Sequence, residues 1–154
     1  MCNTQDHDHE GERAARLCLH LTPGLGWVRF HRLLASHDSA RAVLAAPPAV
    51  LRASLGPAVA TALTDAGARQ ERLDGAKAWL ARYDARVLVF GDPGYPDGLR
   101  RHPAPPPALW LRGRAPGRPA VAIVGTRRAS RAGRERSAHL ARDAVGREAW
   151  VVSG

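Results

Sequence analysis

The chain has 154 residues, a length that fits one ordinary domain or two small ones. Hydrophobic residues make up 45% and charged residues 24%, the balance of a globular chain, and no apolar run approaches the roughly 20 residues that span a membrane. The polar start excludes a secretory signal, and the two cysteines form neither a disulfide framework nor a zinc-binding spacing. These features predict a cytoplasmic protein without a metal, and the net charge of +9 favours a polyanionic partner.

In chain order, the sequence of residues 1–84 predicts a tail followed by helices. We expect residues 1–11 to be a flexible tail and residues 12–84 to form an all-helical domain. Its apolar residues follow a helical spacing interrupted by glycine and proline, with expected helices at 12–21, 27–37, 36–46 and 49–55, another from 57, and a last one at 68–83.

From residue 86 onward, short apolar runs are typical of buried strands. We expect strands at 86–90, 108–111, 120–124 and 149–152, with a helix from about 130 to 145 between the last two. Continuous apolar strands joined by a helix are typical of a parallel sheet covered on both faces. Because the sequence stops directly after the last strand, we expect residues 85–154 to be an incomplete α/β domain.

The excess positive charge lies in the same part of the chain. Residues 1–96 carry 11 basic and 10 acidic side chains, a net charge of +1, whereas residues 97–154 carry 12 and 4, a net charge of +8. A coding bias would explain why all but one of the basic residues are arginines, but not where they lie. The asymmetry predicts a near-neutral module followed by one that attracts phosphate.

The turn after the strand at 120–124 carries the best binding signal. Gly125 would allow a sharp turn and close approach of a ligand, Thr126 offers a hydroxyl, and Ser130 is a suitable N-cap. The free N–H groups of a helix start attract anions, and Arg127, followed by Arg128, would present a fork that suits phosphate. The alternative is an ordinary strand–turn–helix with surface arginines.

The helix that follows carries more arginines, to which we assign lesser roles. Arg131 and Arg134 are expected to contribute charge at most, and Arg131 can pair with Glu135 four residues on. We expect Arg136 to lie on another side of the helix and to be solvated.

Nucleotide and catalytic motifs are missing. No G-x-G-x-x-G follows the strand, and there is no P-loop, zinc-protease motif or nucleophile elbow. We therefore expect no cofactor and no enzymatic activity.

The turn at residues 23–26, with the sequence Pro-Gly-Leu-Gly, lies between two expected helices. It resembles the hairpin of a helix–hairpin–helix element, in which glycines expose N–H groups to a DNA phosphate. A tight turn between packed helices is the alternative.

Four motifs, at residues 94–99, 105–113, 121–130 and 151–154, occur in the order seen in the DNA-processing protein A (DprA, or Smf) family. The resemblance extends from about residue 12 to the end. It implies a small helical domain of sterile-alpha-motif-like (SAM-like) or helix–hairpin–helix type, followed by the first part of a Rossmann-like parallel-sheet domain. It also implies binding of single-stranded DNA in natural transformation, loading of the RecA recombinase onto that DNA, and a homodimer.

By position, Arg127 resembles the arginine with which the family contacts DNA phosphate, and Gly125, Thr126 and Ser130 resemble residues of the same pocket. The chain has Ala132 where family members usually have an aromatic residue. Family members also continue past Ser153 and Gly154 into further strands, which carry the RecA and dimer surfaces. A hydrolase of nucleotide phosphates and a non-functional truncated remnant are the alternatives to single-stranded DNA binding.

Overall fold

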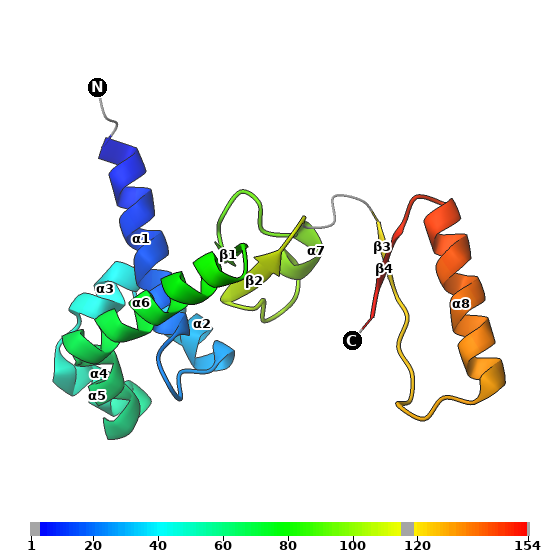
Figure 1. The fold of residues 1–154 in the computed structure, drawn as a ribbon. Helices are drawn as coiled ribbons and strands as arrows, with labels where there is room; N and C mark the ends of the chain where they lie inside the picture. Colours follow the sequence, from blue (N-terminus) through cyan, green and yellow to red (C-terminus); the bar gives the residue numbers. More distant parts are fainter. Residues whose placement is uncertain (1–3, 115–118, 154) are drawn as a thin grey trace. The chain divides into compact units, whose positions relative to one another are not determined.

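The computed structural model describes residues 4–114 and 119–153, with side chains from His9 onward. The chain forms two compact units, one reaching to Gly113 and the other beginning at Arg114 (Figure 1). The first holds most of the helices and a pair of strands, and the second is a strand–helix–strand unit. Within the described residues, no helix combines the length and the apolar character that crossing a membrane requires.

Helices α1 to α6 make up most of the first unit. Their bounds are α1 (Thr4–His20), α2 (Trp27–Ser36), α3 (Ala40–Ala45), α4 (Pro48–Leu55), α5 (Pro57–Thr64) and α6 (Ala66–Arg82). The inward faces of α1 to α5 meet in one hydrophobic core. Each of the first five helices contributes a fully buried side chain, in order Leu19, Phe30, Val43, Leu51 and Leu63. The helical N-terminal part predicted from the spacing of apolar residues is therefore confirmed.

Local capping sets where several of these helices begin. Ser39 Oγ accepts a hydrogen bond from the Ala42 N–H at 3.0 Å at the start of α3. The Asp65 carboxylate accepts one from the Ala68 N–H at 2.9 Å at the start of α6. Prolines open α4 and α5, where the first helical N–H needs no partner. The Ser39 cap also explains why α3 begins after residue 39 rather than at the expected residue 36.

The first helix begins earlier than the sequence suggested. It starts at Thr4, so residues 4–11 of the expected tail belong to α1, and residues 1–3 of that tail lie outside the described residues. The apolar spacing gave no signal there because the segment is polar, yet it contains no proline that would stop a helix.

The strand pair of the first unit is antiparallel. Strand β1 (Ala85–Val89) pairs with β2 (Ala108–Arg112), so that Ala85 lies opposite Arg112 and Val89 opposite Ala108. The connection between them contains only the four-residue helix α7 (Asp97–Arg100). The expectation of parallel pairing is wrong for these two strands, because the chain between them folds back without a crossover helix that would return it to the starting edge.

This strand pair is attached to the helices by polar and apolar contacts. Arg13 of α1 donates to the Val87 carbonyl at 2.7 Å and to the Asp92 carboxylate at 3.0 Å, and Arg16 donates to the Phe90 carbonyl at 2.7 Å. A second apolar cluster lies between the strands and the helices, made by Leu17, Leu80, Val87, Val89 and Ala108. These contacts place the strands in the same compact unit as the helices, and the domain boundary at 84/85 stays a prediction.

The second unit has the predicted order of strand, helix and strand. Strands β3 (Ala120–Ala122) and β4 (Trp150–Val152) are parallel, and α8 (Arg131–Gly146) connects them. The expected burial of both faces is not met in the described residues, since Val121 is 45% and Val152 is 48% exposed. Within residues 119–153, α8 is the only helix beside this sheet. The helical part and this parallel pair together confirm a helical domain followed by part of an α/β domain.

Candidate nucleic-acid interface

Residues 123–130 connect β3 to α8 and contain the predicted site. Thr126 Oγ1 accepts a hydrogen bond from the Arg128 N–H at 3.2 Å, which folds the middle of the loop into a turn. Ser130 Oγ accepts one from the Gly133 N–H at 3.1 Å and caps α8, as predicted. A Cβ at Gly133 would lie 3.3 Å from Ser130 Oγ, so the glycine leaves room for this cap. Short-range hydrogen bonds therefore shape both the loop and the helix start.

A hollow of about 720 Å³ is lined by β3, this loop and one face of α8. Three of the predicted site residues, Gly125, Thr126 and Ser130, line it. Arg127 and Arg128 do not line it, but they are exposed in the same loop. Within residues 119–153, neither arginine side chain has a described hydrogen bond or ion pair. The structure thus brings three predicted residues into one hollow and leaves two positive charges free in the loop that borders it.

Two residues that the sequence analysis did not select also line this hollow. Arg136 and Arg147 contribute to its wall along α8, together with the acidic residue Asp143. Arg136 is exposed and lies on another side of α8 from Arg131 and Arg142, as expected, but that side lines the hollow. Arg136 and Arg147 are eleven residues apart, which is close to three turns of helix, so this spacing was the signal that could have placed them on one face.

Of the two roles that the sequence suggested for Gly125, a sharp turn and close approach of a ligand, the structure does not require the first. The Gly125 backbone is outside the left-handed region, and a Cβ built on it would meet no atom within 4 Å. The turn therefore does not require glycine at this position. The absence of a side chain instead leaves the backbone open to whatever enters the hollow.

The start of α8 has the electrostatic character that an anion requires. Ser130 satisfies one N–H of the first helical turn, and the remaining N–H groups of that turn point out of the helix end. Arg131 pairs with Glu135 at 2.9 Å, as predicted, and Arg134 donates to the Ala129 carbonyl at 2.8 Å. These two arginines are therefore engaged locally.

The carboxylates Glu135 and Asp143 lie along α8 rather than at its start. Glu135 is engaged by Arg131, and Asp143 lies beside His139 at 3.6 Å, thirteen residues beyond Ser130. At 1.5 Å per residue that separation is about 20 Å along the helix. Among the described residues, no group of three or more histidine, cysteine or acidic side chains could hold a metal ion.

The glycine-containing turn before α2 is explained by packing. Gly24 has a φ of +77°, which other residues rarely adopt, and a Cβ there would lie 3.0 Å from Val59 Cγ2 of α5. Leu25 is buried, and Gly26 precedes α2 without a side-chain cap. This turn therefore fits closely against the neighbouring helix.

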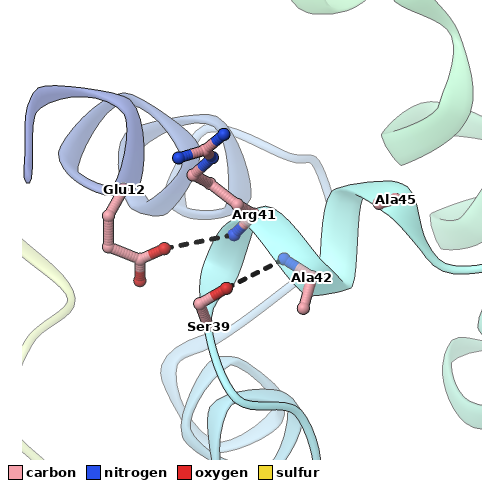
Figure 2. A pocket seen from close by; sticks show the side chains of 5 residues that line it. All are labelled: Glu12, Ser39, Arg41, Ala42 and Ala45. Atoms are coloured by element: carbon pink, nitrogen blue, oxygen red, sulfur yellow. Dashed lines mark hydrogen bonds between the residues drawn. The ribbon is translucent and has the colours of Figure 1, made fainter. Parts of the chain in front are cut away.

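A second hollow, of about 490 Å³, lies among the helices of the first unit (Figure 2). One of its walls is Glu12, whose carboxylate accepts hydrogen bonds from the Ala40 N–H at 3.0 Å, the Arg41 N–H at 3.2 Å and Arg16 Nε at 2.8 Å. Burial alone would raise the pKa of Glu12, but these hydrogen bonds bring that pKa below its ordinary value. Glu12 thus caps α3 from the neighbouring helix, a structural role.

Comparison with known families gives two matches. The family described as DprA-like N-terminal HHH domain matches residues 10–72, and the family described as DNA recombination-mediator protein A matches residues 86–154. No significant match was found among curated proteins or among solved structures. The first match covers most of the helical part, and the second covers the strand pair, the loop at 123–130 and α8. The chain therefore belongs to the DNA-processing protein A (DprA) family.

Proposed function

We propose that this chain is a non-catalytic protein that binds single-stranded DNA in DNA-mediated transformation and recombination. Membership of the family implies the general role, DNA processing for transformation. The observation that carries the finer proposal is the loop at 123–130, where Arg127 and Arg128 are exposed beside the capped start of α8.

The chemistry of this loop suits a backbone phosphate. The phosphate accepts hydrogen bonds from the first N–H groups of α8, and Arg127 adds a bidentate guanidinium fork. Gly125, Thr126 and Ser130 line the hollow in which the nucleotide next to that phosphate lies. Because these contacts go to the phosphate rather than to base edges, binding is independent of sequence.

Two further partners belong to the same proposal. The family resemblance implies that RecA is loaded onto the bound DNA and that two copies of the protein associate, in the cytoplasm. The test below concerns DNA alone.

Hydrolysis of a nucleotide phosphate is the competing activity for such a loop. It would need a carboxylate near the phosphate to act as acid, base or nucleophile. Asp143 is about 20 Å along α8 from Ser130, and Glu135 is held by Arg131. The positions of these carboxylates therefore favour binding over hydrolysis.

Titration of the chain with labelled oligonucleotides tests the proposal. Affinity for single-stranded DNA should fall steeply with salt, by roughly 0.7 log units per log unit of salt for each phosphate neutralised, and should differ little between sequences of equal length. Incubation with nucleoside monophosphates should release no phosphate. Binding that is insensitive to salt, or steady hydrolysis, would contradict the proposal.

A further inference from the structure

Three aromatic side chains lie together where α6 ends beside β2. Trp79 of α6 and Tyr83, the residue that follows the helix, have ring centroids 4.9 Å apart. Trp79 also meets Trp110 of β2 edge to face, with centroids 5.3 Å apart. All three belong to the first compact unit, so the cluster is complete within it. We call these three residues the aromatic cluster.

The aromatic cluster is not part of the hydrophobic core. Trp79 is 43%, Tyr83 is 40% and Trp110 is 37% exposed, whereas Val87, which pairs with Trp110 across the sheet, is 7% exposed. Val87 lies on the same face of the strand pair as Trp110 and packs with Leu80 in the second apolar cluster, which does not include the three rings. Three neighbouring aromatic side chains that each keep about two fifths of their surface exposed form a contiguous apolar patch, and such patches mark surfaces used for binding.

The charges around the aromatic cluster select the kind of partner. The Arg82 guanidinium lies over the Tyr83 ring, 5.6 Å from its centroid. Arg112 follows Trp110 by two residues on β2 and therefore lies on the same face of the strand. Both arginines are exposed, and no ion pair is described for either within residues 4–114. A surface that combines open aromatic rings with unpaired guanidinium groups complements unstacked bases joined by phosphates.

We propose that the aromatic cluster is a second contact for single-stranded DNA, on which exposed bases stack while Arg82 and Arg112 contact the adjoining phosphates. The inference rests on the proposed binding of single-stranded DNA by this chain. It adds a contact of a different kind, because the loop at 123–130 recognises phosphate and the aromatic cluster recognises the faces of bases. Stacking of this kind is tolerant of sequence, since every base has a π-face.

The test compares two probes with the chain of residues 1–154, an oligothymidylate and an abasic strand of equal length. Trp79→Ala should weaken binding of oligothymidylate by about 5-fold to 100-fold, the range for loss of one stacked base, and should leave binding of the abasic strand unchanged. Trp79→Phe keeps an aromatic face and should retain most of the affinity. Trp27→Ala is the matched control, because Trp27 is similarly exposed, at 46%, but stacks on His102 outside the cluster.

A second measurement does not depend on the stability of the alanine variant. In a chain carrying Trp27→Phe and Trp150→Phe, the remaining tryptophans are the two of the aromatic cluster. Their fluorescence should be quenched by oligothymidylate and not by the abasic strand. Quenching by neither strand, or by both equally, would overturn the inference.

The outcomes separate this inference from the proposed function. Arg127→Ala should weaken both probes, because both carry phosphates. Suppose that Arg127→Ala weakens binding of both probes, while Trp79→Ala changes the affinity for neither probe or for both equally. Bases then do not stack on the aromatic cluster, and the proposed function stands. Self-association lost in Trp79→Ala at unchanged DNA affinity would show that a second copy covers the cluster, which also overturns the inference. Failure of the unsubstituted chain to bind oligothymidylate would refute both proposals.

Discussion

Two carboxylates hold separate elements of the first unit together by accepting hydrogen bonds from backbone N–H groups and arginine side chains. Glu12 of α1 accepts backbone N–H groups at the start of α3 as well as the side chain of Arg16. Asp92, after β1, accepts the Val89 N–H at 2.9 Å and the side chain of Arg13. In each case a charged oxygen satisfies backbone donors that would otherwise lack partners, and hydrogen bonds to charged groups are among the stronger ones in proteins.

The hydrogen bonds of Glu12 make the stability of the first unit depend on pH. Because the folded protein lowers the pKa of Glu12, its contribution is present above the ordinary value of 4.5 and is lost as the pH falls through the lower folded-state pKa. Glu12→Gln should therefore reduce the free energy of unfolding at neutral pH by about 1–2 kcal/mol and by less in acid. Urea unfolding followed by circular dichroism at both pH values measures this difference.

Glu10→Gln is the control for that experiment, since Glu10 is an exposed residue of the same helix. It should leave the free energy of unfolding nearly unchanged at either pH. An equal loss for Glu12→Gln at neutral and acid pH would contradict a role for the ionised carboxylate.

At the scale of elements, the sequence predicted the helices and caps, because these depend on residues that are close together in the chain. The helices followed from apolar spacing, glycine and proline, and Ser130 was recognised as a cap because capping acts over three residues. The direction of pairing between β1 and β2 was not predictable in this way, because it depends on how an irregular connection folds back. The extension of α1 to Thr4 was missed because a polar helix has no apolar period.

Two glycines in helical surroundings should respond oppositely to alanine. Gly56 joins α4 to α5 with a φ of +80°, and Gly75 lies exposed inside α6, while a Cβ at either would meet no atom within 4 Å. Gly56→Ala should lower the free energy of unfolding by about 1–3 kcal/mol, because its φ of +80° and ψ of 163° form a conformation that residues with a side chain rarely adopt. Gly75→Ala should raise the free energy of unfolding by about 0.5–1 kcal/mol. Alanine has a higher helix propensity than glycine, and it reduces the conformational entropy of the unfolded chain.

Chemical denaturation of the two variants decides this prediction. Both changes add the same methyl group to open space, so the difference between them isolates backbone conformation. Destabilisation by both substitutions, or by neither, would show that the helix junction at Gly56 is not as described.

At the scale of the whole molecule, the sequence identified residues that line one hollow but not all the residues around it. The order of strand, turn and capped helix identified Thr126 and Ser130, which line the hollow. Arg136 and Arg147 were not selected, because their spacing of eleven residues puts them on one face of α8 but does not show that this face lines the hollow. The compact units were also not predictable, since Arg13 and Arg16 contact residues more than 70 positions away.

Limited proteolysis distinguishes the compact units from the domain boundary suggested by the sequence. The contacts of Arg13 and Arg16 with β1 and its following turn should protect the strand pair together with the helices. The stable fragment should therefore end near Gly113, as mass spectrometry of the digest would show. A stable fragment that ends near residue 84 would instead support separate domains divided at 84/85.

The central claim, that the loop at 123–130 binds a DNA phosphate, is tested most directly by the salt dependence of two arginine variants. Arg127→Ala removes an exposed charge of the loop, and Arg142→Ala removes the same charge from a position on α8 that does not line the hollow. Affinity for single-stranded DNA is measured for each variant at several salt concentrations. We expect Arg127→Ala to weaken binding to every oligonucleotide and to flatten the log–log slope by roughly 0.7, while Arg142→Ala changes neither quantity appreciably. Equal losses for the two variants, or no loss for Arg127→Ala, would contradict a phosphate site in this loop.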